Sequence, residues 1–173
     1  LNWATLAGDG RGGVEGERNP LKGLSLPREE SPNRPVVSDD RYRAMLDVAP
    51  EIDWRFELAL VLANETGHRI GSIRRLRWSD VELESPAIRW RGEADKIGHD
   101  HVTPISQAAT AALQGSRQHN PAIGDAWVFP APEDPAKPCS RHLMRDWWSR
   151  TEELAGLDPV DGLGWHGLRR KFA

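Results

Sequence analysis

The sequence predicts a mainly helical α+β domain with one small antiparallel sheet. Apolar residues recur at helical spacing in the segments 38–49, 53–65, 106–119 and 140–155. Residues 81–92 and 99–106 are short extended segments on either side of a Gly-bounded loop, which is typical of a small antiparallel sheet. Helical segments therefore dominate, and the extended ones suffice for one sheet.

The first helix has recognisable signals at both ends. Ser38 is a good N-cap, and the two aspartates that follow it suit a first turn. Tyr42, Met45 and Ala49 lie on one apolar stripe, so Tyr42 is expected to pack against the core. Pro50 is expected to end the helix.

The remaining elements follow in order. Residues 53–65 are apolar enough for a more buried helix, and Gly67 is a plausible stop. A short third helix is predicted over 70–77, a short extended piece over 126–130, and a further helix that starts at 166. In the helix at 140–155, Trp147 and Trp148 are expected to be partly buried.

The chain of 173 residues is long enough for one domain and a fragment of a second. Residues 1–34 are expected to be the end of a preceding domain plus a Gly- and Pro-rich linker, and residues 35–173 a domain incomplete at its C-terminus. The longest apolar run, Leu58–Ala63, is too short to span a membrane. Cys139 is the single cysteine, which suits a reducing compartment and predicts a cytoplasmic protein.

Charge is distributed unevenly along the chain. The formal net charge is −3, from 23 Lys and Arg against 26 Asp and Glu, which by itself argues against a nucleic-acid partner. Residues 67–79, however, carry four Arg and no acidic residue, and three cations lie at 169–171. Such local patches decide what a surface binds.

The segment 65–83 contains the first candidate for anion binding. Arg69 follows the turn Thr66-Gly67 at the start of a predicted helix, where helix N–H groups and a guanidinium can hold an anion together. Arg74, Arg75 and Arg77 have a simpler explanation as solvated side chains of an amphipathic helix.

Two further candidates lie downstream. Lys96 lies at a predicted hairpin tip, where a lysine is most often only a solubilising residue. His166 and Arg169 are spaced to share one helix face, so that one phosphate could contact both. The pattern by itself is weak, since His142 and Arg145 repeat it on what we interpret as a helix surface.

Taken together and in this order, the motifs resemble those of the tyrosine recombinase (phage integrase) family. Thr66-Gly67-His68-Arg69 and Leu76-Arg77-Trp78-Ser79-Asp80 are similar to its first Arg box. Lys96 precedes Val102-Thr103-Pro104-Ile105 as the family's catalytic Lys precedes a strand, and residues 166–173 are similar to its second box, with Arg170 in place of the usual second His. Ser72 and His101 stand where the family often has Glu and Arg. Residues 19–24 resemble its junction between a DNA-clasping N-terminal domain and the catalytic domain.

The resemblance implies a tyrosine-recombinase-like catalytic domain that breaks and rejoins double-stranded DNA through a 3′-phosphotyrosyl intermediate, without a metal or ATP. It implies that Arg69 and Arg169 stabilise charge on the phosphate, that Lys96 protonates the leaving 5′ oxygen, and that His166 assists proton transfer or holds the phosphate. Six further residues are expected to contact DNA: Arg74, Arg75, Arg77, His101, Arg170 and Lys171. No Cys, His or carboxylate cluster has the spacing of a metal site.

The nucleophilic tyrosine of the family lies some tens of residues beyond the second Arg, whereas the one tyrosine here is Tyr42. We therefore expect residues 1–173 to bind DNA weakly as a monomer without cleaving it, and the full-length protein to act as a homo-tetramer on DNA. Three alternatives stay open: a non-catalytic DNA-binding relative, a degenerate integrase, and a helical interaction module whose arginines are only solvated.

Overall fold

The computed structural model describes residues 34–94 and 98–172, which belong to a compact unit covering Asn33–Ala173. The predicted end of a preceding domain and its linker therefore lie almost entirely outside the described residues, as does Lys96. The helices are α1 (Asp39–Ile52), α2 (Trp54–Thr66), α3 (Ile70–Ile73), α4 (Gln107–His119), α5 (Arg141–Leu154) and α6 (Trp165–Arg169). Short 3-10 helices cover Trp78–Asp80, Gly92–Ala94 and Arg170–Phe172. The predicted mainly helical α+β architecture is confirmed.

The sheet has three antiparallel strands in the order β1 (Val81–Glu82), β2 (Ala87–Trp90), β3 (His101–Pro104). Pairing of Ile88 with Thr103 and of Trp90 with His101 sets the β2–β3 register. This register buries Ile88 and Trp90 and leaves Arg89 exposed, as expected for strands with alternating faces. The hairpin between β2 and β3 is thus anchored to the core by one face of β2.

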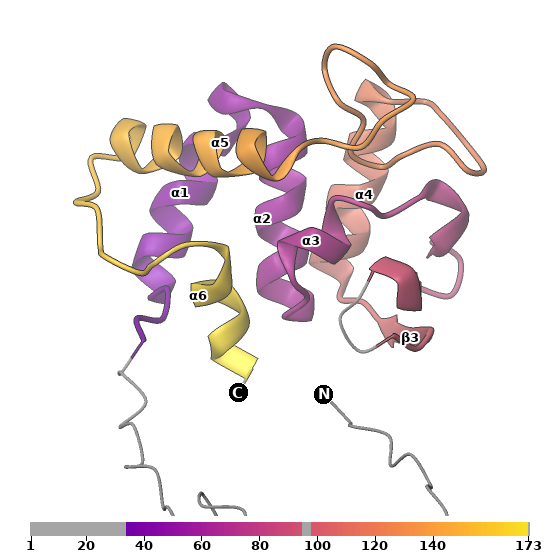
Figure 1. Ribbon diagram of the computed structural model, residues 1–173, viewed down its shortest axis with the longest axis horizontal. Helices are drawn as coiled ribbons and strands as arrows, with labels where there is room; N and C mark the ends of the chain where they lie inside the picture. The colour runs from indigo at the N-terminus through magenta and orange to yellow at the C-terminus, as the bar shows by residue number, and fades with distance from the viewer. Residues whose placement is uncertain (1–33, 95–97, 173) are drawn as a thin grey trace, which may run out of the picture. The chain divides into compact units, whose positions relative to one another are not determined.

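Helix α2 forms the centre of the described unit. It runs between α1 and α4, and α5 crosses α1 and α2 (Figure 1). The run Leu58–Ala63 is almost wholly buried, which explains why the sequence is apolar on all sides of this helix. Side chains from α3, α5 and α6 complete the same core. Trp147 and Trp148 of α5 are more deeply buried than predicted, at 4% exposure each.

Helix boundaries were predicted well where a capping side chain sets them. The Ser38 hydroxyl accepts from the Arg41 N–H, and Ser106 and Ser140 cap α4 and α5 in the same way. Gly67 ends α2 in the left-handed conformation, with φ 64°. These caps are local interactions, and local sequence is enough to reveal them.

Two boundary predictions were wrong. Pro50 does not end α1, because the proline forfeits only its own hydrogen bond, and the Asp53 N–H still donates to the Ala49 carbonyl at 3.2 Å. Helix α3 ends at Ile73 instead of Arg77, because the backbone beyond it pairs with another segment. The Val128 N–H donates to the Leu76 carbonyl at 2.9 Å, a partner distant in sequence that no local signal predicts.

Candidate functional site

The turn that precedes Arg69 is the first part of the site. Gly67 reverses the chain after α2, and Arg69 follows in extended conformation as the N-cap residue of α3. The Gly67 carbonyl accepts a hydrogen bond of 2.9 Å from Nη1 of Arg169. The two arginines predicted to clamp a phosphate are therefore joined through this one turn, although 102 residues separate Gly67 from Arg169.

Gly67 also lies against Phe172. A Cβ built at Gly67 would lie 2.7 Å from a ring carbon of Phe172, and the φ of 64° is itself unfavourable for any residue with a Cβ. We predict that Gly67→Ala lowers the free energy of unfolding by about 1–2 kcal/mol. Urea unfolding followed by circular dichroism would measure the loss.

Gly156→Ala is the matched control for this prediction. Gly156 has φ 63° after α5, and no atom lies within 4 Å of a Cβ built there. Both substitutions should carry the same backbone penalty, so a larger loss at Gly67 reports the contact with Phe172. Equal losses would show that Phe172 yields without cost, and no loss at either glycine would contradict the prediction.

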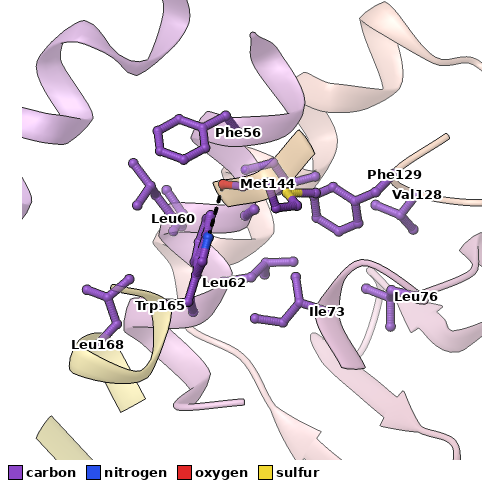
Figure 2. Close-up of a cluster of buried hydrophobic side chains, with 14 of the residues drawn as sticks. Phe56, Leu60, Leu62, Ile73, Leu76, Val128, Phe129, Met144, Trp165 and Leu168 are labelled. Atoms are coloured by element: carbon purple, nitrogen blue, oxygen red, sulfur yellow. Dashed lines mark hydrogen bonds between the residues drawn. The ribbon is translucent and has the colours of Figure 1, made fainter. Parts of the chain in front are cut away.

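Helix α6 is held in place by the apolar residues beside His166 and Arg169. Trp165 and Leu168 point into the core beside Phe56, Leu60 and Leu62 (Figure 2). The Trp165 indole N–H donates to the Met144 carbonyl at 3.1 Å, which ties α6 to α5. With one face of α6 buried in this way, His166 remains exposed, and the half-buried Arg169 reaches the Gly67 turn.

A pocket of about 460 Å³ opens where these parts meet. Its lining includes three arginines, Arg69 and Arg75 on either side of α3 and Arg141 at the start of α5, together with His166. Gly71, Ser72, Glu93 and Ala94 supply much of its floor and rim. Arg69 and His166 are remote in sequence, and only the family resemblance paired them. Both line this one pocket.

The cations around the pocket change the titration of His166. Partial burial lowers the pKa of this histidine, and the charges of Arg170, Arg69, Arg169 and Arg141 lower it further. The free site therefore favours the neutral imidazole, which can accept a proton. A bound anion would act in the opposite direction, because it would partly neutralise the guanidinium charges and raise the pKa.

Most of the chain is similar in sequence to known proteins. The profile of the phage integrase family matches residues 35–173, which include the Arg69 turn, the sheet and α6. The chain belongs to the phage integrase family. Of curated proteins, the tyrosine recombinase XerC of Xanthomonas axonopodis pv. citri (strain 306) is 25% identical over 114 residues, covering 65% of this chain and 36% of that protein.

Solved structures of recombinases share the fold of this integrase-family chain. The XerA recombinase aligns with a TM-score of 0.66 at 20% identity, over 90% of this chain and 53% of that one. Lambda integrase bound to DNA aligns with a TM-score of 0.62 at 22% identity, over 79% of this chain and 48% of that one. The chain thus spans about half of these two structures and about a third of XerC.

The other cations predicted to contact DNA occupy different environments. Arg75 is exposed on the pocket wall, whereas Arg77 stacks over Trp127 at 3.8 Å and donates to the Asp125 carbonyl at 2.6 Å. Both line a second, smaller pocket of about 220 Å³ together with Arg91. These two arginines flank the site on the side of the sheet.

Three more of the predicted DNA contacts are, like Arg77, engaged with protein groups. Arg74 donates to the Cys139 carbonyl at 2.9 Å, and burial lowers the pKa of its guanidinium. Arg170 donates to the Pro35 carbonyl, and Lys171 pairs with Asp39 at 2.7 Å. Each of these side chains has a structural contact, so a role in DNA binding stays a prediction for them.

His101 lies beside a second histidine at the end of the sheet. Its Nε2 is 3.0 Å from Nε2 of His68, and the His68 ring stacks on Trp90 at 3.7 Å. The Gly92 N–H donates to Asp100 at 2.8 Å and closes the base of the hairpin. Lys96 belongs to the loop between Gly92 and Asp100. It lies outside the described residues, so its position stays a prediction.

Tyr42 lies against the core, as predicted. Burial and, to a smaller extent, the charge of Glu65 raise the pKa of its hydroxyl to about 12. Lys171 lies over its ring, 5.4 Å from the centroid. A phenol that ionises so reluctantly is poorly suited to nucleophilic attack.

Sequence analysis missed Arg141. It is the first residue of α5, in a helix predicted only from its apolar stripe, and nothing in its neighbourhood distinguishes it from other surface arginines.

In the described part of the chain, residues 34–94 and 98–172, no group of three His, Cys, Asp or Glu side chains could hold a metal ion. In the same ranges, no helix is both long and apolar enough to cross a bilayer.

Proposed function

We propose that this chain supplies the phosphate-binding residues of a site-specific DNA recombinase, which cleaves and rejoins double-stranded DNA through a 3′-phosphotyrosyl intermediate. The observation that carries the proposal is the convergence of the two Arg boxes. Arg69 and His166 line one pocket, and Arg169 is hydrogen-bonded to the turn that leads into Arg69. Membership of the phage integrase family and the likeness to lambda integrase bound to DNA support the same reaction and the same partner.

The arginines would act on the phosphodiester under attack. As the tyrosine oxygen bonds to phosphorus and the bond to the 5′ oxygen breaks, negative charge gathers on the non-bridging oxygens. Fixed guanidiniums stabilise that charge through paired, charge-assisted hydrogen bonds, and they do not reorganise during the step. We assign this role to Arg69 and Arg169.

Proton transfer would complete each step. Lys96 is proposed to protonate the leaving 5′ oxygen, and His166 to hold the phosphate or relay a proton. Because the covalent intermediate retains the energy of the phosphodiester, rejoining requires no ATP. Arg75 and Arg77, which line the smaller pocket beside the site, are proposed to contact neighbouring phosphates without reading sequence. Assembly as a tetramer on DNA belongs to the same proposal.

DNA binding by the chain tests the phosphate-binding part. We expect the affinity for duplex DNA to fall between 50 and 200 mM salt, and Arg69→Ala to weaken binding roughly ten-fold and reduce the salt dependence by about one phosphate contact. Fluorescence anisotropy of a labelled duplex would measure both.

Arg145→Ala is the matched control, since Arg145 belongs to the second His-x-x-Arg of the sequence. Its guanidinium is exposed on α5 and contacts His142 at 2.7 Å, outside the pocket lining. Salt-independent or absent binding would contradict the proposal and favour a helical interaction module. Binding without cleavage by the complete gene product, or no tyrosine codon in a basic context downstream of the Ala173 codon, would favour a non-catalytic relative.

A further inference from the structure

The pocket holds a cation that comes from outside both the segment 65–83 and the segment 166–173. Arg141 lines it beside Arg69 and His166, although it enters from the start of α5, far in sequence from both boxes. Its charge is among those that lower the pKa of His166, which lines the same pocket, and that of the nearby Arg74. Arg141 is thus part of the site by position and by charge.

Gly71 provides the space that Arg141 occupies. A Cβ built at Gly71 would lie 3.0 Å from Nη2 of Arg141 and 3.7 Å from both Cζ and Nε. Three atoms of the guanidinium group are therefore packed over the backbone of α3 at this position. The φ of Gly71 is not in the left-handed region, so the backbone alone does not require glycine there. Alanine would favour the helix more than glycine does, and the close approach of Arg141 is the contact that alanine would disturb.

The net positive charge of the pocket lining favours the binding of an anion. Among the residues that the structure describes, its lining has three arginines and one acidic residue, the exposed Glu93. Among the described residues, the side chains of Arg75 and Arg141 have neither a hydrogen-bond nor an ion-pair partner. Like charges held close together repel one another, and an anion bound among them removes that penalty. A phosphodiester fits, because each planar guanidinium can offer it two parallel donors.

We propose that Arg141 is a third phosphate-binding guanidinium of this site, and that the absence of a side chain at Gly71 seats it there. The inference rests on the proposed function, because it takes the ligand to be the DNA phosphate bound by Arg69 and Arg169. Arg141 would contact a non-bridging oxygen from the α5 side of the pocket. The site would then be closed by three separate elements of the fold.

The first test compares Arg141→Ala with Arg145→Ala in duplex DNA binding by the 173-residue chain. Both arginines are exposed on α5, one turn apart, but only Arg141 lines the pocket. We expect Arg141→Ala to weaken binding roughly ten-fold and to reduce the slope of log affinity against log salt by about 0.9, and Arg145→Ala to change neither. Arg141→Lys should keep the slope, because its charge remains, and lose part of the affinity with the planar fork.

The second test asks whether Gly71 acts through Arg141. Gly71→Ala should weaken DNA binding in the parent chain and have little further effect in the Arg141→Ala background. Equal effects in both backgrounds would show that Gly71 matters only to α3 itself, and would overturn that part of the inference.

A site-specific readout uses inorganic phosphate and the NMR titration of His166. Phosphate should raise the pKa of His166 in the parent chain and in Arg145→Ala, and raise it less in Arg141→Ala. If Arg69→Ala weakens DNA binding while Arg141→Ala behaves like Arg145→Ala in both assays, the role of Arg141 is wrong and the proposed function stands. If the parent chain binds no DNA, or Arg69→Ala leaves its affinity unchanged, the proposed function itself fails, and this inference with it.

Discussion

Replacement of Trp165 by alanine is expected to lower the free energy of unfolding by about 3–5 kcal/mol, a large fraction of what a domain of this size has. Only 9% of Trp165 is exposed, and its ring meets Phe56 edge-on at 5.5 Å and Trp148 at 5.2 Å. Alanine would leave a cavity at the junction of α2, α5 and α6 and remove the hydrogen bond to Met144. Urea unfolding monitored by circular dichroism would measure the change.

This prediction also concerns the site, because Trp165 is the residue before His166. Without its anchor, α6 should lose its fixed position, and DNA binding should weaken even where the protein remains folded. Trp54→Ala is the control, since Trp54 is only half-buried and stacks on His119 at 5.6 Å, on the side of α2 that faces α4. A loss at Trp165 no greater than that at Trp54 would mean that α6 is held by other contacts.

Arg169→Ala is expected to have the largest effect on the reaction. The complete protein should lose about 100- to 1000-fold in the rate of the proposed DNA strand cleavage, the usual cost of removing one donor that stabilises transition-state charge. The loss would have two sources, because Arg169 is proposed to bind the phosphate and also donates to the Gly67 carbonyl. Single-turnover cleavage of a nicked DNA substrate by the complete protein would measure it.

Arg169→Lys separates the two sources. Lysine keeps the charge but has no planar fork with which to hold a carbonyl and a phosphate together, so we expect it to recover only a small part of the rate. Arg145→Ala, in the other His-x-x-Arg, should cleave at the parental rate. Cleavage by Arg169→Ala within a few-fold of the parental rate would rule out the proposed role.

How much of the fold and of the site could be predicted depends on how far apart in sequence the partners of each interaction lie. Ser38, Ser106, Ser140 and Gly67 are caps, whose partners lie within four residues, so the sequence around them contains the whole signal. The effect of Pro50 was mispredicted because its local preference to break a helix is outweighed by the hydrogen bond from the Asp53 N–H to the Ala49 carbonyl, which continues α1. Local propensity decides a boundary only where tertiary contacts do not oppose it.

The sequence by itself determined the family, since the order of Arg69, Lys96, His166 and Arg169 within their motifs is a property of the chain and needs no coordinates. It also determined the mainly helical architecture and the small sheet. What only the tertiary structure decided is which cations share the pocket. Arg141 enters it and Arg145 does not, although both are exposed arginines on one helix. The physical reason is packing: Trp165 and Leu168 dock α6 on the buried core beside α2, α5 crosses that core, and the glycine of α3 leaves room where they meet.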